Sequence, residues 1–290
     1  MRKFFVAASV AMLIVAAPRL VRAQNIASEA LRTVTTLYAE DEELKRIPVG
    51  TAFFVEVPSN SFPGSSFVYL VTTRHNLFDA EGQPYEKLFV QLDDGHGARF
   101  EPVPEASQWI MDPHNPGADI VALPIAPSNA NYETVSIMRF LNGSKETMLP
   151  PKDQVGNDAY YITTVPGTNR ITPVTRFGKV SVATPSAVQI PGMGTQYFYF
   201  LEGASPPDLS GAPVFLKTKG DVILWGLVES KSDPNRRFSG LIAVLPVGYV
   251  GETVKAMADQ QDVKPASGIS KPAPSLPSPL RGALPPRQKR

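Results

Sequence analysis

Two polar residues capable of proton transfer stand at the boundaries of predicted strands. His75 follows the apolar run Phe67–Val71, and an imidazole titrates near neutral pH, so it can take a proton and return it within one cycle. Asp119 heads the apolar run Ile120–Ile125. A carboxylate at the edge of a core needs strong hydrogen bonds, and the N–H group of an imidazole can supply one.

The third candidate, Ser210, lies in the turn Asp208-Leu209-Ser210-Gly211-Ala212. Such a turn can expose the hydroxyl while backbone amides converge near it, as stabilisation of an oxyanion requires. Each residue alone has a simpler interpretation. A histidine after a strand is more often structural, an aspartate in a turn bonds backbone amides, and most serines are ordinary loop residues. The three together, in the order His, Asp, Ser, favour chemistry.

The elements that must position these residues are predicted to be short strands. Prolines (29) and glycines (21) are spread along the chain, and the apolar stretches between them are rich in β-formers. These stretches are Thr51–Val57, Phe67–Val71, Leu88–Leu92, Ile120–Ile125, Ala159–Thr164, Gln196–Leu201, Val214–Lys217, Val222–Val228 and Leu241–Pro246. Many short strands predict an all-β barrel or sandwich. One helix is predicted, because Val250, Val254 and Met257 share a helical face.

Three segments carry a resemblance to a known family. LVTTRHNL, ADIVALPI and DLSGAPVF resemble the three signature blocks of the trypsin-like (chymotrypsin-fold) serine peptidases, in the family's order and with similar spacing. VILWGLV resembles the strand beside the bound substrate, SGLIAVLPV resembles the closing strand, and residues 50–55 resemble an early strand of the disulfide-free bacterial type. The resemblance covers residues 31–261 and implies two antiparallel six-stranded β-barrels with a C-terminal helix.

The resemblance also implies a function, an exported serine endopeptidase that hydrolyses peptide bonds through an acyl-enzyme. Ser210 would attack the scissile carbonyl, His75 would act as general base and then acid, and Asp119 would orient His75. The backbone amides of Asp208 and Ser210 would hold the oxyanion. This chemistry needs no metal and no organic cofactor, and its expected partner is a polypeptide substrate.

The sequence departs from the family pattern near the predicted site. Asp208 stands where the family usually has glycine, so a catalytically weak or inactive fold that binds a peptide or protein without cutting it remains the alternative. Ala204 stands where trypsin itself carries an acid, which favours small or apolar substrate residues. Glu229 and Ser230, in the stretch resembling the substrate-pairing edge, are expected to bind substrate, with Glu229 and Lys231 contributing charge.

Composition narrows the function class further. The formal charge of +1 gives no field that would favour nucleic acid as a partner. The chain contains no cysteine, which excludes disulfides and thiol catalysis. His96, close to Asp93 and Asp94, is expected in a hairpin turn and not in a metal site.

The two ends of the chain differ from the middle. Residues 1–23 combine a basic start with a short apolar run and small residues before a cut after Ala23, the pattern of a secretory signal peptide. We therefore expect export to the periplasm or the medium of a bacterium, with no membrane span in the mature chain. Residues 24–262 are predicted to form the peptidase domain. Residues 263–290, rich in proline and basic side chains, are predicted to be a disordered tail.

Overall fold

The computed structural model describes residues 30–93, 96–112, 115–125, 132, 135–136, 154–190, 194–203, 209–217, 222–229 and 240–263. The predicted leader and residues 264–290 of the predicted tail lie outside these ranges, as do Ala204, Asp208, Ser230 and Lys231. Within the described ranges, no helix has the length and apolar character needed to cross a membrane.

The first half of the chain forms one sheet. Its strands are β1 (Val34–Glu40), β2 (Arg46–Pro58), β3 (Ser66–Thr72), β4 (Leu88–Asp93), β5 (Ala98–Val103), β6 (Ile110–Met111), β7 (Val121–Pro124) and β8 (Val135–Ser136). They pair in the order β5-β4-β1-β2-β3-β7-β6, and β8 runs parallel to β2. Two short 3₁₀ helices interrupt the connections, η1 (Arg74–Leu77) and η2 (Ala106–Gln108).

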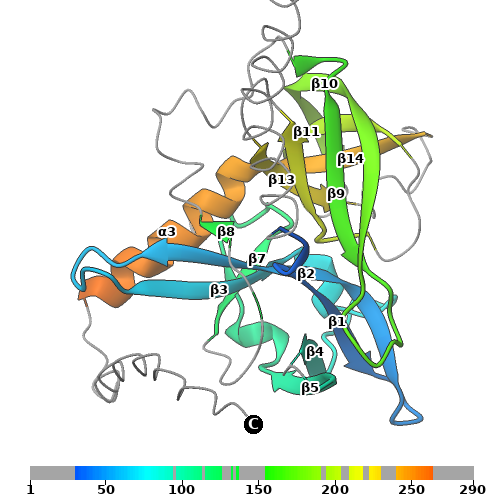
Figure 1. The fold of residues 1–290 in the computed structure, drawn as a ribbon, viewed down its shortest axis with the longest axis vertical. Coiled ribbons are helices and arrows are strands. Elements are labelled where there is room, and N and C mark those ends of the chain that lie inside the picture. Colours follow the sequence, from blue (N-terminus) through cyan, green and yellow to red (C-terminus); the bar gives the residue numbers. More distant parts are fainter. Residues whose placement is uncertain are drawn as a thin grey trace, which may run out of the picture.

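The second half closes into a six-stranded barrel. Its strands are β9 (Asp158–Thr164), β10 (Pro173–Ile190), β11 (Gly194–Glu202), β12 (Pro213–Lys217), β13 (Val222–Glu229) and β14 (Leu241–Pro246), paired in the order β10-β11-β14-β13-β12-β9. Helix α3 (Val247–Val263) follows β14 directly. In Figure 1 the barrel stands above the first sheet, and α3 runs down alongside both.

These observations confirm the predicted all-β class with a C-terminal helix, and every expected strand is present. The two lobes differ in one respect. The second lobe is a closed barrel of six strands, whereas pairing in the first sheet follows an open path among the described residues. The edge strand β6 contains only two residues, which is too short for a ladder that would close the sheet onto β5.

The largest hydrophobic cluster is shared between the two lobes. It is built from residues of the first sheet, the barrel and the helix, including Val34, Phe53, Tyr69, Ile120, Ile162, Phe200, Phe215, Leu227, Val250, Val254 and Met257. The helix is also tied to the first sheet by a hydrogen bond of 2.9 Å from the Tyr69 hydroxyl to Gln261 Oε1. Because a close-packed core resists sliding, this cluster fixes the orientation of the lobes.

Hydrogen bonds reinforce the same junction at a second place. The connection between β9 and β10 reaches back to the first sheet, where Gln91 Nε2 donates to the Thr168 carbonyl at 2.9 Å. The amide of Ala98 donates to the Asn169 carbonyl at 2.8 Å. The two lobes are thus held in register by backbone as well as by apolar contacts.

Candidate active site

His75 is positioned by the end of strand β3. The strand ends at Thr72, and η1 begins two residues later, so the chain turns sharply at this point. The amide of Arg74 donates to the Asp119 carbonyl at 3.3 Å, and the amide of His75 donates to Asp119 Oδ1 at 3.0 Å. The turn that carries the histidine is therefore fastened to the residue that orients its ring.

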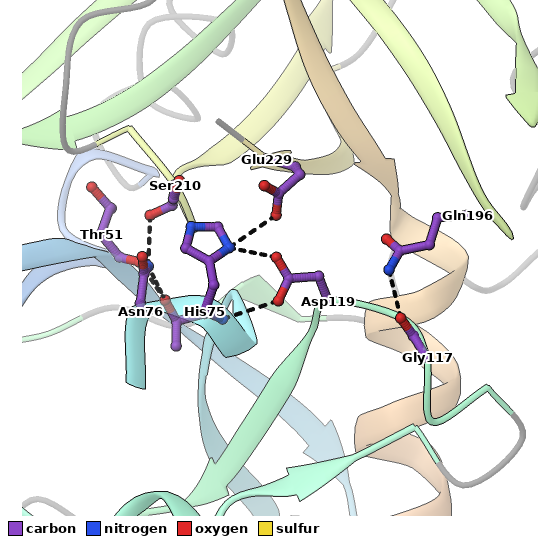
Figure 2. Close-up of polar contacts among 9 residues, drawn as sticks. Thr51, His75, Asn76, Gly117, Asp119, Gln196, Ser210 and Glu229 are labelled. Carbon is purple, nitrogen blue, oxygen red and sulfur yellow. Dashed lines mark hydrogen bonds and ion pairs between the residues drawn. The ribbon is translucent and has the colours of Figure 1, made fainter. Parts of the chain in front are cut away.

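The side chain of Asp119 lies just before β7 and is buried, with 2% of the residue exposed. Its second oxygen, Oδ2, lies 2.5 Å from His75 Nδ1. Because an ionised carboxylate only accepts hydrogen bonds, Nδ1 is assigned as the donor, and in the neutral ring Nε2 is the proton acceptor. From β11, Gln196 Nε2 donates to the Gly117 carbonyl at 2.5 Å, which ties the loop before Asp119 to the barrel (Figure 2).

Ser210 lies in the turn before β12, where the Ala212 amide donates to the Leu209 carbonyl at 2.9 Å. Figure 2 shows Ser210 on the side of the imidazole opposite the carboxylates, facing the other ring nitrogen. The turn depends on Gly211, whose φ is +86°. A Cβ atom at this position would meet the Thr51 carbonyl oxygen at 2.0 Å. Only glycine fits this approach to the first sheet.

The serine turn belongs to the barrel but is held by the first sheet. The Ser210 carbonyl accepts two hydrogen bonds, from the Thr51 amide at 2.9 Å and from Asn76 Nδ2 at 3.0 Å. Asn76 Nδ2 also donates to Thr72 Oγ1 at 2.9 Å, and that hydroxyl donates to the Thr51 carbonyl at 2.7 Å. These contacts cross the junction between the lobes and fix the serine relative to the histidine.

The hydrogen bonds that Thr51, Thr72 and Asn76 form around the Ser210 carbonyl are called the brace below. The sequence did not predict these residues. Asn76 lies directly after His75 in the sequence, and a buried amide at that position is the one local signal that could have suggested it. Thr51 donates its backbone amide to the Ser210 carbonyl, and a backbone contact of this kind cannot be recognised from the residue type. Strand β2 and the helix η1 approach each other closely at Gly50, because a Cβ atom there would lie 2.1 Å from Asn76 Nδ2.

Glu229, at the end of β13, occupies a place that the sequence did not predict. It was expected to contribute charge to substrate binding, but its side chain is only 2% exposed and its Oε2 atom lies 3.2 Å from His75 Nδ1. The carboxyl group therefore faces the imidazole from the same side as Asp119 (Figure 2). Glu229 pairs with Ala243 of β14, which is buried in the shared hydrophobic cluster. Directly opposed residues of an antiparallel pair point to the same face of the sheet, so Glu229 points inward.

The three ionisable groups alter one another strongly. Burial alone would lower the pKa of His75, but the charge of Glu229 and the hydrogen bond to Asp119 raise it from 6.5 to about 10. Burial and the charge of Asp119 raise the pKa of Glu229 to about 7. Burial opposes ionisation of Asp119 as well, yet hydrogen bonds from Glu229 and His75 hold its pKa well below its ordinary value. Asp119 is therefore the permanent anion of the three.

His75, Asp119 and Glu229 also bring three possible metal-ligating atoms within 4.8 Å of one another. The spacing fits hydrogen bonding better than coordination. Two ligands of a tetrahedral zinc ion with bonds of about 2.0–2.1 Å stand about 3.3 Å apart, whereas Nδ1 and Oδ2 are separated by 2.5 Å. A metal ion would have to push the histidine and aspartate apart.

One pocket of about 300 Å³ lies on the first sheet beside this site. It is lined mainly by apolar side chains, Leu77, Phe78, Pro84, Ala106, Trp109, Met111 and Val121, with Arg74 and Ser107. None of His75, Asp119 and Ser210 contributes to its wall, so the pocket is separate from these three residues. The residues predicted for substrate specificity, Ala204 and Ser230, lie outside the described ranges, as does Asp208 of the predicted oxyanion hole.

The closed barrel, the sheet before it and the terminal helix define the fold of the trypsin-like serine proteases. Among solved structures, the active form of the Rv3671c protease from M. tuberculosis aligns with 82% of this chain and 86% of its own, with a TM-score of 0.50 and 16% sequence identity. The HtrA-type protease AlgW with a decapeptide aligns with 81% of this chain and 66% of its own, with a TM-score of 0.46 and 18% identity. No protein-family model and no curated protein sequence matches the chain. The first likeness confirms the fold that the sequence resemblance implied.

Proposed function

We propose that this chain is a serine endopeptidase that hydrolyses polypeptides through an acyl-enzyme on Ser210. The observation that carries the proposal is the bonding of His75. Its Nδ1 atom is held by Asp119 at 2.5 Å, while its other nitrogen faces Ser210. A ring fixed in this tautomer can act as a base toward a hydroxyl on its Nε2 side. The trypsin-like fold supports the same function by analogy only.

The proposed cycle keeps the proton within the site. Ser210 Oγ attacks the scissile carbonyl carbon while His75 Nε2 takes the hydroxyl proton. The imidazolium, paired with Asp119, then returns that proton to the leaving amine, and the peptide bond breaks. Water attacks the acyl-enzyme by the same route and releases the acid. The amides of Asp208 and Ser210 would stabilise the oxyanion, and loss of one such donor costs about 3–4 kcal/mol.

Export and specificity belong to the same proposal. The pattern of residues 1–23 supports secretion, with the mature chain beginning at Gln24. Ala204 supports a preference for small or apolar residues before the cleaved bond.

A second candidate function is capture of a peptide without cleavage. The observation that favours it is the pKa of His75, about 10, because an imidazole that stays protonated at neutral pH accepts no proton from Ser210. Asp208, with its negative charge beside the expected oxyanion, favours it too.

Incubation with a mixed peptide library separates these candidates. We expect wild-type protein to cleave library peptides at alkaline pH and Ser210→Ala to lose at least about 10³-fold in rate, because the nucleophile is removed while the binding surface stays. Mass spectrometry of the products measures both the rate and the residues flanking the cut.

Equal cleavage by both proteins would assign the activity to a contaminant and contradict the proposal. Wild-type protein that binds peptides but leaves them intact between about pH 6 and 10 would establish capture as the function.

A further inference from the structure

A second carboxyl group faces the same edge of the imidazole as Asp119. Glu229 Oε2 lies 3.2 Å from His75 Nδ1, and Asp119 Oδ2 lies 2.5 Å from the same atom. All three side chains are nearly inaccessible, with exposed fractions of 11% for His75, 3% for Asp119 and 2% for Glu229. A single Nδ1–H group therefore meets two acceptors in a site that admits little water.

In this position Glu229 faces His75 and not a bound substrate. Its carboxyl group lies behind the histidine, on the side opposite Ser210 (Figure 2). A buried carboxylate without compensation is unfavourable. His75 compensates the ionised form of Glu229, whereas the charge of Asp119 and the hydrogen bond to Asp119 favour its protonated form. Among the described residues, the charges that act on Glu229 are those of Asp119 and His75.

Among the described residues, the other ionisable groups on the neighbouring elements do not act on Glu229. Strand β12 carries only Lys217, which is exposed, and β14 carries none. The Arg74 guanidinium lies 5.7 Å from the centre of the Phe78 ring. Helix α3 carries Tyr249, Glu252, Lys255, Asp259 and Asp262. None of these groups contributes to the titration of Glu229, so within the described residues the protonation of the site is decided by three side chains.

We propose that Glu229 is a positioning residue that shares the Nδ1 side of His75 with Asp119 and sets the pH at which the imidazole becomes free to take the proton of Ser210. The proposal rests on the proposed serine-peptidase function. In it, the protonated Glu229 carboxyl donates a hydrogen bond to Asp119. The ionised carboxylate instead stabilises the imidazolium, so His75 keeps its proton to higher pH than Asp119 alone would allow.

The sign of the effect follows from the charges. A negative group within a few ångströms stabilises a cation and raises its pKa by about one to three units. Replacing Glu229 with neutral glutamine removes that charge and keeps nearly the same volume. The neutral, base-competent form of His75 then appears at lower pH. A residue that only supported the packing would change the rate at all pH values alike.

The first experiment follows the rate at which a fluorophosphonate labels Ser210 as a function of pH. We expect the rising limb of the Glu229→Gln profile to move about one to three pH units below that of wild type. Glu229→Asp retains the charge and should restore most of the wild-type position. Glu202→Gln, an exposed glutamate on β11, is the matched control and should leave the profile unchanged.

A second experiment does not depend on activity. The chain has three histidines, so NMR titration of their ring signals can follow His75 in the Ser210→Ala background, with His96 and His114 as internal references. Adding Glu229→Gln to that background should lower the His75 midpoint by the same one to three units. It should also shift the low-field Nδ1 proton signal, because one of two carboxyl neighbours is lost.

The two experiments distinguish failure of the proposed peptidase function from failure of the proposed role of Glu229. If labelling occurs in wild type but neither the limb nor the His75 midpoint moves in Glu229→Gln, the role of Glu229 is refuted and the peptidase stands. If wild type is never labelled but the His75 midpoint falls, the peptidase fails and the control of His75 by Glu229 stands. Melting temperatures of the variants show whether each has folded. Glu229→Ser, which also removes the charge, provides the test if Glu229→Gln does not fold.

Discussion

At the residue scale, the site contrasts two carboxyl groups whose surroundings give them different protonation. Asp119 accepts hydrogen bonds on both oxygens, from the His75 amide and from Nδ1, and these bonds favour its ionised form. Glu229 is also buried, and it lies beside that fixed negative charge, so its own ionisation is delayed. Separation of two neighbouring carboxyl pKa values in this way is typical of sites that move protons.

The sequence predicted which residues belong to this site, but it did not predict how all of them are arranged. His75, Asp119 and Ser210 could be selected because each stands at a boundary between an apolar run and a polar turn. Glu229 was singled out too, as a substrate contact, because its direction could not be read from the sequence. A shift of one residue along a strand reverses the face to which a side chain points. The pairing of β13 with β14 decides that direction, and the pairing is not local.

Asp119→Asn tests the orientation of the ring. Asparagine keeps the size of the side chain but can present an N–H group to Nδ1, which favours the tautomer with its proton on Nε2. We expect the rate of peptide cleavage to fall by about 10⁴-fold, with the protein still folded, as measured by initial rates and a thermal melt. A loss below about tenfold would show that Asp119 does not select the tautomer of His75.

At the element scale, the serine turn depends on a close approach that only one residue type permits. Gly211 combines a left-handed backbone with a Cβ position 2.0 Å from the Thr51 carbonyl oxygen. Its own amide donates to the Val228 carbonyl at 2.9 Å. The turn is thereby fixed to β13 on one side and to β2 on the other.

Gly211→Ala and Gly64→Ala form a matched pair. Gly64 also has a left-handed φ, +82°, but an added Cβ meets nothing within 4 Å. Both alanines bear about 1–2 kcal/mol of backbone strain, and only Gly211→Ala adds a steric clash of about 1–3 kcal/mol. Urea unfolding should show the larger loss of stability for Gly211→Ala, and its cleavage rate should fall as well. Equal stability losses would contradict the close approach.

Strands whose apolar residues are continuous were predictable, and strands interrupted by polar or special residues were not. β3, β7 and β13 are buried along most of their length, so their sequences are nearly all apolar. β10 escaped prediction because it extends over 18 residues with proline, glycine and charged side chains inside it. Its pairing with β11 contains register shifts, which accommodate these residues and leave no regular period in the sequence.

At the scale of the whole molecule, the candidate site exists only where the two lobes meet. The first sheet supplies His75 and Asp119, and the barrel supplies Ser210 and Glu229. The shared hydrophobic cluster and the brace from Asn76 to the Ser210 carbonyl hold these groups together. The resemblance of three sequence blocks implied this meeting, but the contacts that enforce it join residues as far apart as Tyr69 and Gln261, which are separated by 192 positions. Local patterns carry no information at that separation.

In the proposed function, Ser210 is a nucleophile activated by His75. The most direct measurement treats protein produced from the full-length sequence with a fluorophosphonate probe at neutral and alkaline pH, and locates the adduct by peptide mass spectrometry. We expect one adduct, on Ser210, with labelling that increases with pH and disappears in Ser210→Ala and His75→Ala. Folded wild-type protein that stays unlabelled throughout, or an adduct at another residue, would contradict it.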